Sequence, residues 1–159
     1  MSTRSATIIR EEEGKWERNE DGLYEQVGTE LKELARFYRH HDGYPDGHGL
    51  HMAHSFVSAE SLEGRDWFQR AFGPFMTGEG LKGTDFETWG APTIEFEPAG
   101  TQHGDLEYLY AVTKRLKSEP TIGVWAIGWD EGYDEALARE PLFEGTAAEY
   151  IEHMNRQVC

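Results

Sequence analysis

Three β-prone runs separated by short turns, all in the second half of the chain, constrain the fold more than any other feature. The runs cover 93–97, 105–113 and 121–129, and the turns between them fall at 100–104 and 117–120. Connections this short favour antiparallel neighbours, because a parallel crossover needs a dozen or more residues. The third run is apolar on both faces, which is typical of a central strand. The sequence therefore predicts an antiparallel sheet.

The first part of the chain adds strands to this sheet. An acidic N-terminal hairpin is expected over about 1–28, because Asn-Glu-Asp-Gly at 19–22 is a strong turn signal. The stretch 29–41 has some apolar residues at helical spacing, but 35–39 alternates as a strand does. A strand ending at Arg39 is therefore expected.

Helical patterns occur in three places. Apolar residues at helical spacing predict a helix over 49–59, and a second short helix is expected over 66–75, ended by Gly73-Pro74. Thr146 with Glu149 three residues later forms a capping box that starts the last helix.

These elements define the expected fold class. The chain reads as a single α+β domain over 1–159, with an antiparallel sheet of about four to six strands and two or three helices packed on it. A Gly-rich loop is expected over about 77–92, and a loop of this length inside a compact domain is functional or mobile.

The balance of charge excludes several classes of partner. Thirty acidic against fifteen basic residues give a formal net charge of −15, which repels phosphate backbones, so no direct nucleic-acid binding is expected. No stretch has the ~20 apolar residues of a membrane span, and the single cysteine, Cys159, leaves no internal disulfide. A cytoplasmic protein is expected. The excess of acidic residues has three interpretations: it keeps the protein soluble, it adapts the protein to a high-salt cytoplasm, or it makes the protein a decoy that occupies the basic groove of a nucleic-acid-binding protein.

Residues that could bind a metal or a ligand are concentrated at 36–54. This segment holds five of the seven histidines: His40, His41, His48, His51 and His54. His48, His51 and His54 recur every three residues, so two neighbours on a helix could share a Zn ion, completed by Asp42, Asp46 or a strand-end histidine. No His-Glu-x-x-His motif or cysteine pair accompanies them. The alternative is a polar start to a helix in an acidic protein.

The same segment contains a candidate anion site. Arg36, Arg39 and His40 gather scarce positive charge at the end of a strand, next to Asp42 and Tyr44 in the following turn. Guanidinium groups bind phosphate by paired hydrogen bonds, so these five residues form the predicted ligand-binding set. Pairing of the cations with carboxylates of the chain is the alternative. Asp42-Gly43-Tyr44-Pro45 is also typical of a purely structural turn.

No catalytic residue is predicted. Glu95, Glu97 and Glu107 are acidic side chains on neighbouring strands, which suits the solvated face of a sheet more than acid–base chemistry. Phosphate-binding loops and nucleophile motifs do not occur in the sequence.

One motif resembles a known group of proteins. The segment 37–45 reads Phe-Tyr-Arg-His-His-Asp-Gly-Tyr-Pro, and 104–110 reads Gly-Asp-Leu-Glu-Tyr-Leu-Tyr. Both resemble motifs of small uncharacterised proteins from phages, prophages and archaeal viruses. The resemblance implies a mobile-element accessory protein, a class that commonly blocks a host factor or sequesters a signalling nucleotide. It carries no assigned catalytic residues.

Three hypotheses follow. The first is a non-enzymatic viral or prophage accessory protein without a cofactor, which binds a host protein or a small anionic ligand in the host cytoplasm. Counter-defence is one form of this hypothesis. The second is a metal-dependent hydrolase or metal-binding domain that uses the His/Asp cluster over 40–54, with Zn as cofactor. The third is a structural or assembly module of a virus, which would form a homo-oligomer.

Overall fold

The computed structural model describes residues 3–78 and 92–157. Over these residues it contains one six-stranded sheet and four α-helices, which confirms the α+β class. The strands are β1 (Ser5–Arg18), β2 (Tyr24–Arg39), β3 (Glu95–Phe96), β4 (Tyr108–Lys114), β5 (Thr121–Ala126) and β6 (Phe143–Thr146). The helices are α1 (Leu50–Ser58), α2 (Trp67–Thr77), α3 (Tyr133–Leu137) and α4 (Ala147–Gln157), with a π-helical turn, η1 (Pro45–Gly49), before α1.

The strand order is β3-β2-β1-β4-β5-β6, and the sheet is mixed rather than wholly antiparallel. β1 and β4 are parallel, with Ser5 opposite Tyr108 and Glu11 opposite Lys114. The other neighbouring pairs are antiparallel. The expectation of antiparallel pairing was wrong at β1–β4, because the short-turn argument covers only neighbours along the chain and this pair is joined through β2, α1, α2 and β3.

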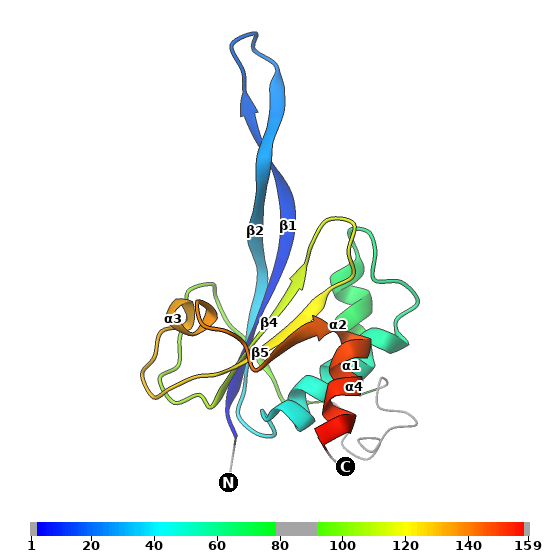
Figure 1. The fold of residues 1–159 in the computed structure, drawn as a ribbon, viewed down its shortest axis with the longest axis vertical. Helices are drawn as coiled ribbons and strands as arrows, with labels where there is room; N and C mark the ends of the chain where they lie inside the picture. Colours follow the sequence, from blue (N-terminus) through cyan, green and yellow to red (C-terminus); the bar gives the residue numbers. More distant parts are fainter. Residues whose placement is uncertain (1–2, 79–91, 158–159) are drawn as a thin grey trace.

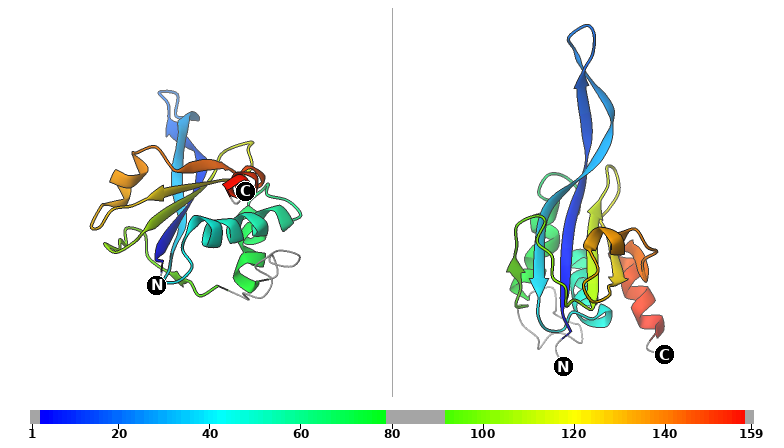
Figure 2. Two further views of the ribbon diagram at one scale, coloured as in Figure 1. Left: turned by 60° about the horizontal axis from the view of Figure 1, so that its bottom comes forward. Right: turned by 90° about the vertical axis from the view of Figure 1, so that its left-hand side faces the viewer.

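The N-terminal hairpin is longer than the expected 1–28. β1 and β2 pair from Ser5 with Arg39 out to Arg18 with Tyr24, so the strand that ends at Arg39 is the second half of the same hairpin. The expected turn is present: the Asn19 side chain accepts backbone N–H bonds from Asp21 and Leu23. Figures 1 and 2 show the hairpin leaving the body as a twisted two-stranded ribbon.

The body has a hydrophobic core on each face of the sheet. Helices α1, α2 and α4 cover one face, where the largest fully buried side chains are Phe37, Phe56, Trp67, Phe72, Phe75, Tyr110 and Tyr150. α3 covers the other face, where Ala6, Ile8, Leu109, Ala111, Trp125 and Tyr133 pack together. β4 and β5 contribute to both cores, which explains their apolar character on both sides and confirms β5 as an internal strand.

The helices follow the sequence patterns with two exceptions. α1 lies within the expected 49–59, and α4 begins with the expected capping box, since Thr146 Oγ1 accepts the Glu149 N–H (3.3 Å) and Glu149 Oε1 accepts the Thr146 N–H (2.9 Å). α2 continues past Gly73-Pro74, because the fully buried Phe75 ties its last turn to the core. α3 was not expected. Most of the expected Gly-rich loop, 79–91, lies outside the described residues.

Candidate functional site

The turn after β2 is held by buried structural contacts. Asp42 adopts a left-handed conformation (φ 59°), and its carbonyl accepts the His48 N–H at 3.0 Å. Two buried tyrosines bind the turn from the sheet and α4: Tyr110 donates to the Gly43 carbonyl and Tyr150 to the Pro45 carbonyl, each at 2.7 Å. The segment 42–45 therefore has a structural task, the connection of β2 to α1.

His48 lies at the centre of this connection and is fully buried. Its Nδ1 is 3.2 Å from Arg39 Nη1, and its Nε2 is 2.8 Å from Thr7 Oγ1. Because a guanidinium can only donate, Nδ1 accepts, so the proton is on Nε2, which donates to Thr7. Burial and the nearby Arg39 hold the pKa of His48 well below its usual value. Both ring nitrogens are engaged, so neither offers a lone pair to a metal in this arrangement.

The other two histidines of the predicted Zn set lie along α1. His51 is fully buried with its ring 4.6 Å from the Phe75 ring, and burial lowers its pKa to about 3. His54 is partly exposed. Within residues 3–78 and 92–157, no group of three or more His, Cys, Asp or Glu side chains is placed to hold a metal ion.

The two arginines of the predicted anion site diverge. Side chains along a strand alternate between its two faces, and Arg36 and Arg39 are three residues apart. The two side chains therefore lie on opposite faces of β2. Arg36 binds Glu33 at 2.8 Å and the Thr101 carbonyl, and its guanidinium lies 5.3 Å from the Tyr133 ring centroid. Arg39 faces His48 in the other core. The structure therefore does not bring the two guanidinium groups to one ligand.

The remaining residues of that predicted set are more exposed. His40 Nδ1 lies 2.9 Å from the Tyr38 hydroxyl and 3.3 Å from Arg4 Nε. Tyr44 donates its hydroxyl to Asp42 at 3.3 Å. His40 thus belongs to a polar group on the α3 face of the sheet, whereas Asp42 and Tyr44 bind each other within the turn.

A histidine–carboxylate pair next to this polar group was missed in the sequence. His103 Nε2 lies 2.8 Å from Glu97 Oε2, and the His103 ring stacks on Tyr38 with centroids 4.3 Å apart. Glu97 was expected on the solvated face of the sheet, but its side chain is only 14% exposed, whereas the neighbouring Phe96 is 51% exposed. β3 is only two residues long, so the alternation expected over 93–97 does not persist.

Several of the exposed large hydrophobic side chains in the described residues lie on the outer part of the hairpin. We define the arm as residues 12–31, which comprise the outer halves of β1 and β2 and the turn between them (Figure 1). Glu12 is opposite Leu31, Trp16 opposite Gln26, and Arg18 opposite Tyr24. Since directly opposed residues share a face, Trp16, Tyr24 and Leu31 lie on one face of the ribbon. They are 59%, 71% and 38% exposed.

The opposite face of the arm is charged. It carries Glu13, Lys15, Glu17, Glu25 and Glu30. Glu13 is directly opposite Glu30, and Glu17 is directly opposite Glu25. The face with Trp16, Tyr24 and Leu31 also carries Glu12 and Arg18, so it is the more apolar of the two faces rather than wholly apolar. At its base Glu12 contacts the β4–β5 turn, whereas Trp16 and Tyr24 farther out are mostly exposed.

Backbone edges of the arm are also open. β4 pairs with β1 only as far as Glu11, and β3 pairs with β2 only at Phe37 and Tyr38. Over the described residues, neither outer strand of the arm has a second neighbour. Open edges accept added strands from other chains.

No family model, curated protein sequence or solved structure matches the chain. None of the helices in the described ranges has the length and apolar character needed to cross a bilayer.

Proposed function

We propose that this chain is a non-enzymatic binding protein that attaches to a partner protein through the arm. The motif resemblance gives the proposed setting, an accessory protein of a phage, prophage or archaeal virus that acts on a host factor in the cytoplasm. The single observation that carries the proposal is the exposed face with Trp16, Tyr24 and Leu31, held away from the body on a two-stranded ribbon.

The energetics of the arm support a bound state. A two-stranded ribbon without a packed face is marginally stable in water, so the arm gains order when a partner covers it. Exposed tryptophan and tyrosine are the residue types that contribute most to protein interfaces. Burial of one such side chain contributes on the order of 2 kcal/mol. Two aromatic side chains and a leucine on one face thus provide the type of anchor around which a protein interface forms.

The charges of the arm indicate what kind of partner fits. Residues 12–31 contain seven carboxylates and two basic side chains, a net charge of −5. Like charges directly opposite each other destabilise a ribbon, as at Glu13–Glu30 and Glu17–Glu25. A partner with a cationic groove around an apolar floor removes this repulsion, whereas a second copy of a chain with net charge −15 adds to it. We therefore assign a basic protein surface as the occupant.

Site-specific photocrosslinking tests this proposal. A benzophenone amino acid replaces Trp16 or Tyr24 on the apolar face, and matched controls replace Lys15 or Glu25 on the charged face. The chain is then irradiated in the cells in which it naturally acts. We expect one adduct of a single mass from the two apolar positions, with little from the controls, and a crosslinked partner whose contact surface is basic.

The purified pair provides the second part of the test. Binding should weaken steeply between low and high salt, because charge attraction is screened over about 10 Å at 0.1 M ionic strength. Adducts made only with a second copy of the chain, equal crosslinking from both faces, or no adduct at all would each refute arm-mediated binding of a basic partner.

A further inference from the structure

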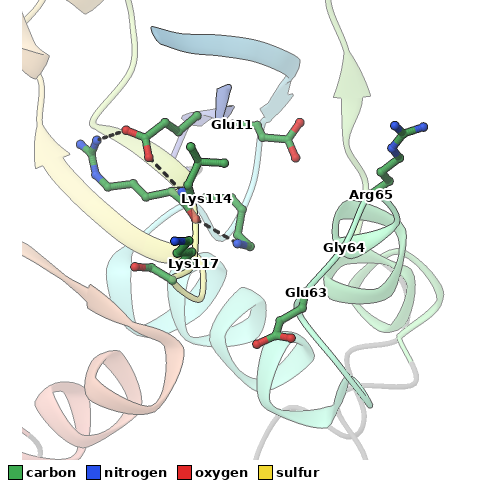
Figure 3. Close-up of a pocket in the computed structure, with 10 residues that line it drawn as sticks. Glu11, Glu63, Gly64, Arg65, Lys114 and Lys117 are labelled. Atoms are coloured by element: carbon green, nitrogen blue, oxygen red, sulfur yellow. Dashed lines mark hydrogen bonds and ion pairs between the residues drawn. The ribbon is translucent and has the colours of Figure 1, made fainter. Parts of the chain in front are cut away.

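A pocket of about 520 Å³ at the base of the arm gathers much of the scarce positive charge of the chain. It lies between the β4–β5 turn, the α1–α2 connection and β1 (Figure 3). Four of the fifteen basic residues line it: Arg65, Lys114, Arg115 and Lys117. In Figure 3, Lys114 and Lys117 lie on one side of the pocket, and Glu63 and Arg65 lie on the other.

Lys114 is the central group of this pocket. It is only 9% exposed, and its ammonium donates to the Arg115 carbonyl at 2.9 Å. An ammonium has three N–H donors, so two remain beyond this bond. Over the described residues, no carboxylate oxygen lies within 4 Å of its Nζ. A buried charge without a counter-charge is costly, and an anion in the pocket would offset that cost.

Three carboxylates line the pocket, those of Glu11, Glu12 and Glu63, and the first two are hydrogen-bonded to its walls. Glu12 accepts the Leu116 N–H at 2.9 Å and the Thr29 hydroxyl at 3.1 Å, and it lies 3.7 Å from Arg115. The Leu116 N–H, with smaller contributions from Thr29 and Arg115, lowers the pKa of Glu12. Glu11 accepts the Trp67 indole N–H at 3.1 Å. Glu11 and Glu12 thus stabilise the walls of the pocket, and none of the three carboxylates, Glu63 included, lies within 4 Å of the Lys114 ammonium.

Lys117, in the turn after β4, has a strained backbone conformation. Lys117 has φ 61°, a left-handed conformation that non-glycine residues adopt at an energetic cost. Within the described part of the chain, its ammonium has no carboxylate within 4 Å. Ser118, which follows it, also lines the pocket and supplies a hydroxyl donor.

We propose that this pocket binds a small phosphate-type anion, either inorganic phosphate or the phosphate group of a small molecule. The Lys114 ammonium is the main contact, and Lys117 adds a second positive charge. Charge-assisted hydrogen bonds to phosphate oxygens are stronger than neutral ones, which suits a partly enclosed pocket with an unmatched ammonium. Of the arm residues, Glu12 lines this site, whereas Trp16, Tyr24 and Leu31 do not.

NMR tests the proposal. The isotopically labelled full chain is titrated with inorganic phosphate and, separately, with pyrophosphate, and its amide spectrum is recorded at each concentration. We expect saturable shifts of backbone amides at 63–65 and 115–118, and a thermal midpoint that rises with phosphate. Lys114→Met keeps the aliphatic stem and removes the charge, so affinity should fall roughly tenfold or more, as loss of one hydrogen bond to a charged group implies. The matched control, Lys15→Met on the arm, should bind as the original chain does.

Two outcomes would overturn the phosphate site. One is shifts that never saturate or that spread over the surface, and the other is an equal loss of affinity in Lys15→Met. If Lys114→Met fails to fold, Lys117→Met replaces it, because that side chain lies on a surface turn. An unchanged affinity in a folded Lys117→Met would then refute the proposed pair of lysines.

Discussion

Acid sensitivity is the sharpest consequence of the two buried histidines on the α1 side of the sheet. An unfolded chain protonates its histidines near pH 6.5, whereas His48 and His51 stay neutral in the folded chain because their pKa values are lowered by burial. The unfolded state therefore binds more protons as the pH falls, so folding stability is full above about pH 7 and is lost as the pH falls below about 6.5 toward the folded pKa values.

The magnitude follows from proton linkage. Between pH 7 and pH 5, each histidine that is neutral only in the folded state lowers the free energy of unfolding by about 2 kcal/mol. His48 and His51 together lower it by about 4 kcal/mol, a large part of the 5–15 kcal/mol that stabilises a typical domain.

His51→Leu isolates one of the two contributions. The variant keeps an apolar contact with Phe75 and cannot be protonated, so its stability should fall by about 2 kcal/mol over the same range rather than 4. Urea unfolding followed by circular dichroism at pH 7 and pH 5, at one ionic strength, measures the two losses. The decrease in net negative charge at lower pH affects both chains alike, so it cancels in the comparison.

Phe72→Leu is the matched control, because it alters the same core without removing a titratable group. It should lower stability by the same amount at both pH values. An equal pH dependence in the original chain and in His51→Leu would refute the assignment of a neutral buried His51.

Two further substitutions test the contacts that position the site. Tyr110→Phe removes the buried hydroxyl that donates to the Gly43 carbonyl, so the free energy of unfolding should fall by about 1–3 kcal/mol in a urea titration. Thr146→Ala removes the N-cap of α4 and its bond to the Glu149 N–H, and thermal unfolding should show a loss of about 1 kcal/mol; no loss would mean that the capping box contributes nothing to α4.

Local patterns predicted the body of the fold well. The alternation at 35–39, the apolar run at 121–126 and the capping box at Thr146 each reflect contacts within one element or with its immediate environment. Such contacts leave a periodic trace in the sequence. The same is true of the turn at 19–22, whose Asn and Gly residues close the hairpin.

The full length of the hairpin and the parallel pairing left no such trace. Residues 29–34 lie in an exposed ribbon and bury little, so their apolar residues do not follow a strand period relative to a core. Two register shifts, at Ile9/Arg10 and Lys15/Trp16, interrupt the alternation further. The phosphate pocket joins residues 11–12, 63–65 and 114–118, and only the folded chain brings these segments together.

The divergence of Arg36 and Arg39 was foreseeable in part. Their positions on opposite faces of a strand followed from the alternation itself, but their partners did not. Arg36 contacts Glu33 next to the register shift at Ile9/Arg10, and Arg39 contacts His48 across the turn after β2. Neither the register shift nor the path of this turn can be read from the alternation of one strand.

The parallel pairing of β1 with β4 also sets the order in which the chain can assemble. The hairpin needs only the first 39 residues and closes locally, on a timescale of microseconds for a simple hairpin. The central strand pair needs residue 108 and beyond, so during synthesis the inner edge of β1 stays bare until most of the chain has left the ribosome. Throughout that interval the edge of β1 over Ser5–Glu11, which has only one acidic residue, is open to added strands from neighbouring chains.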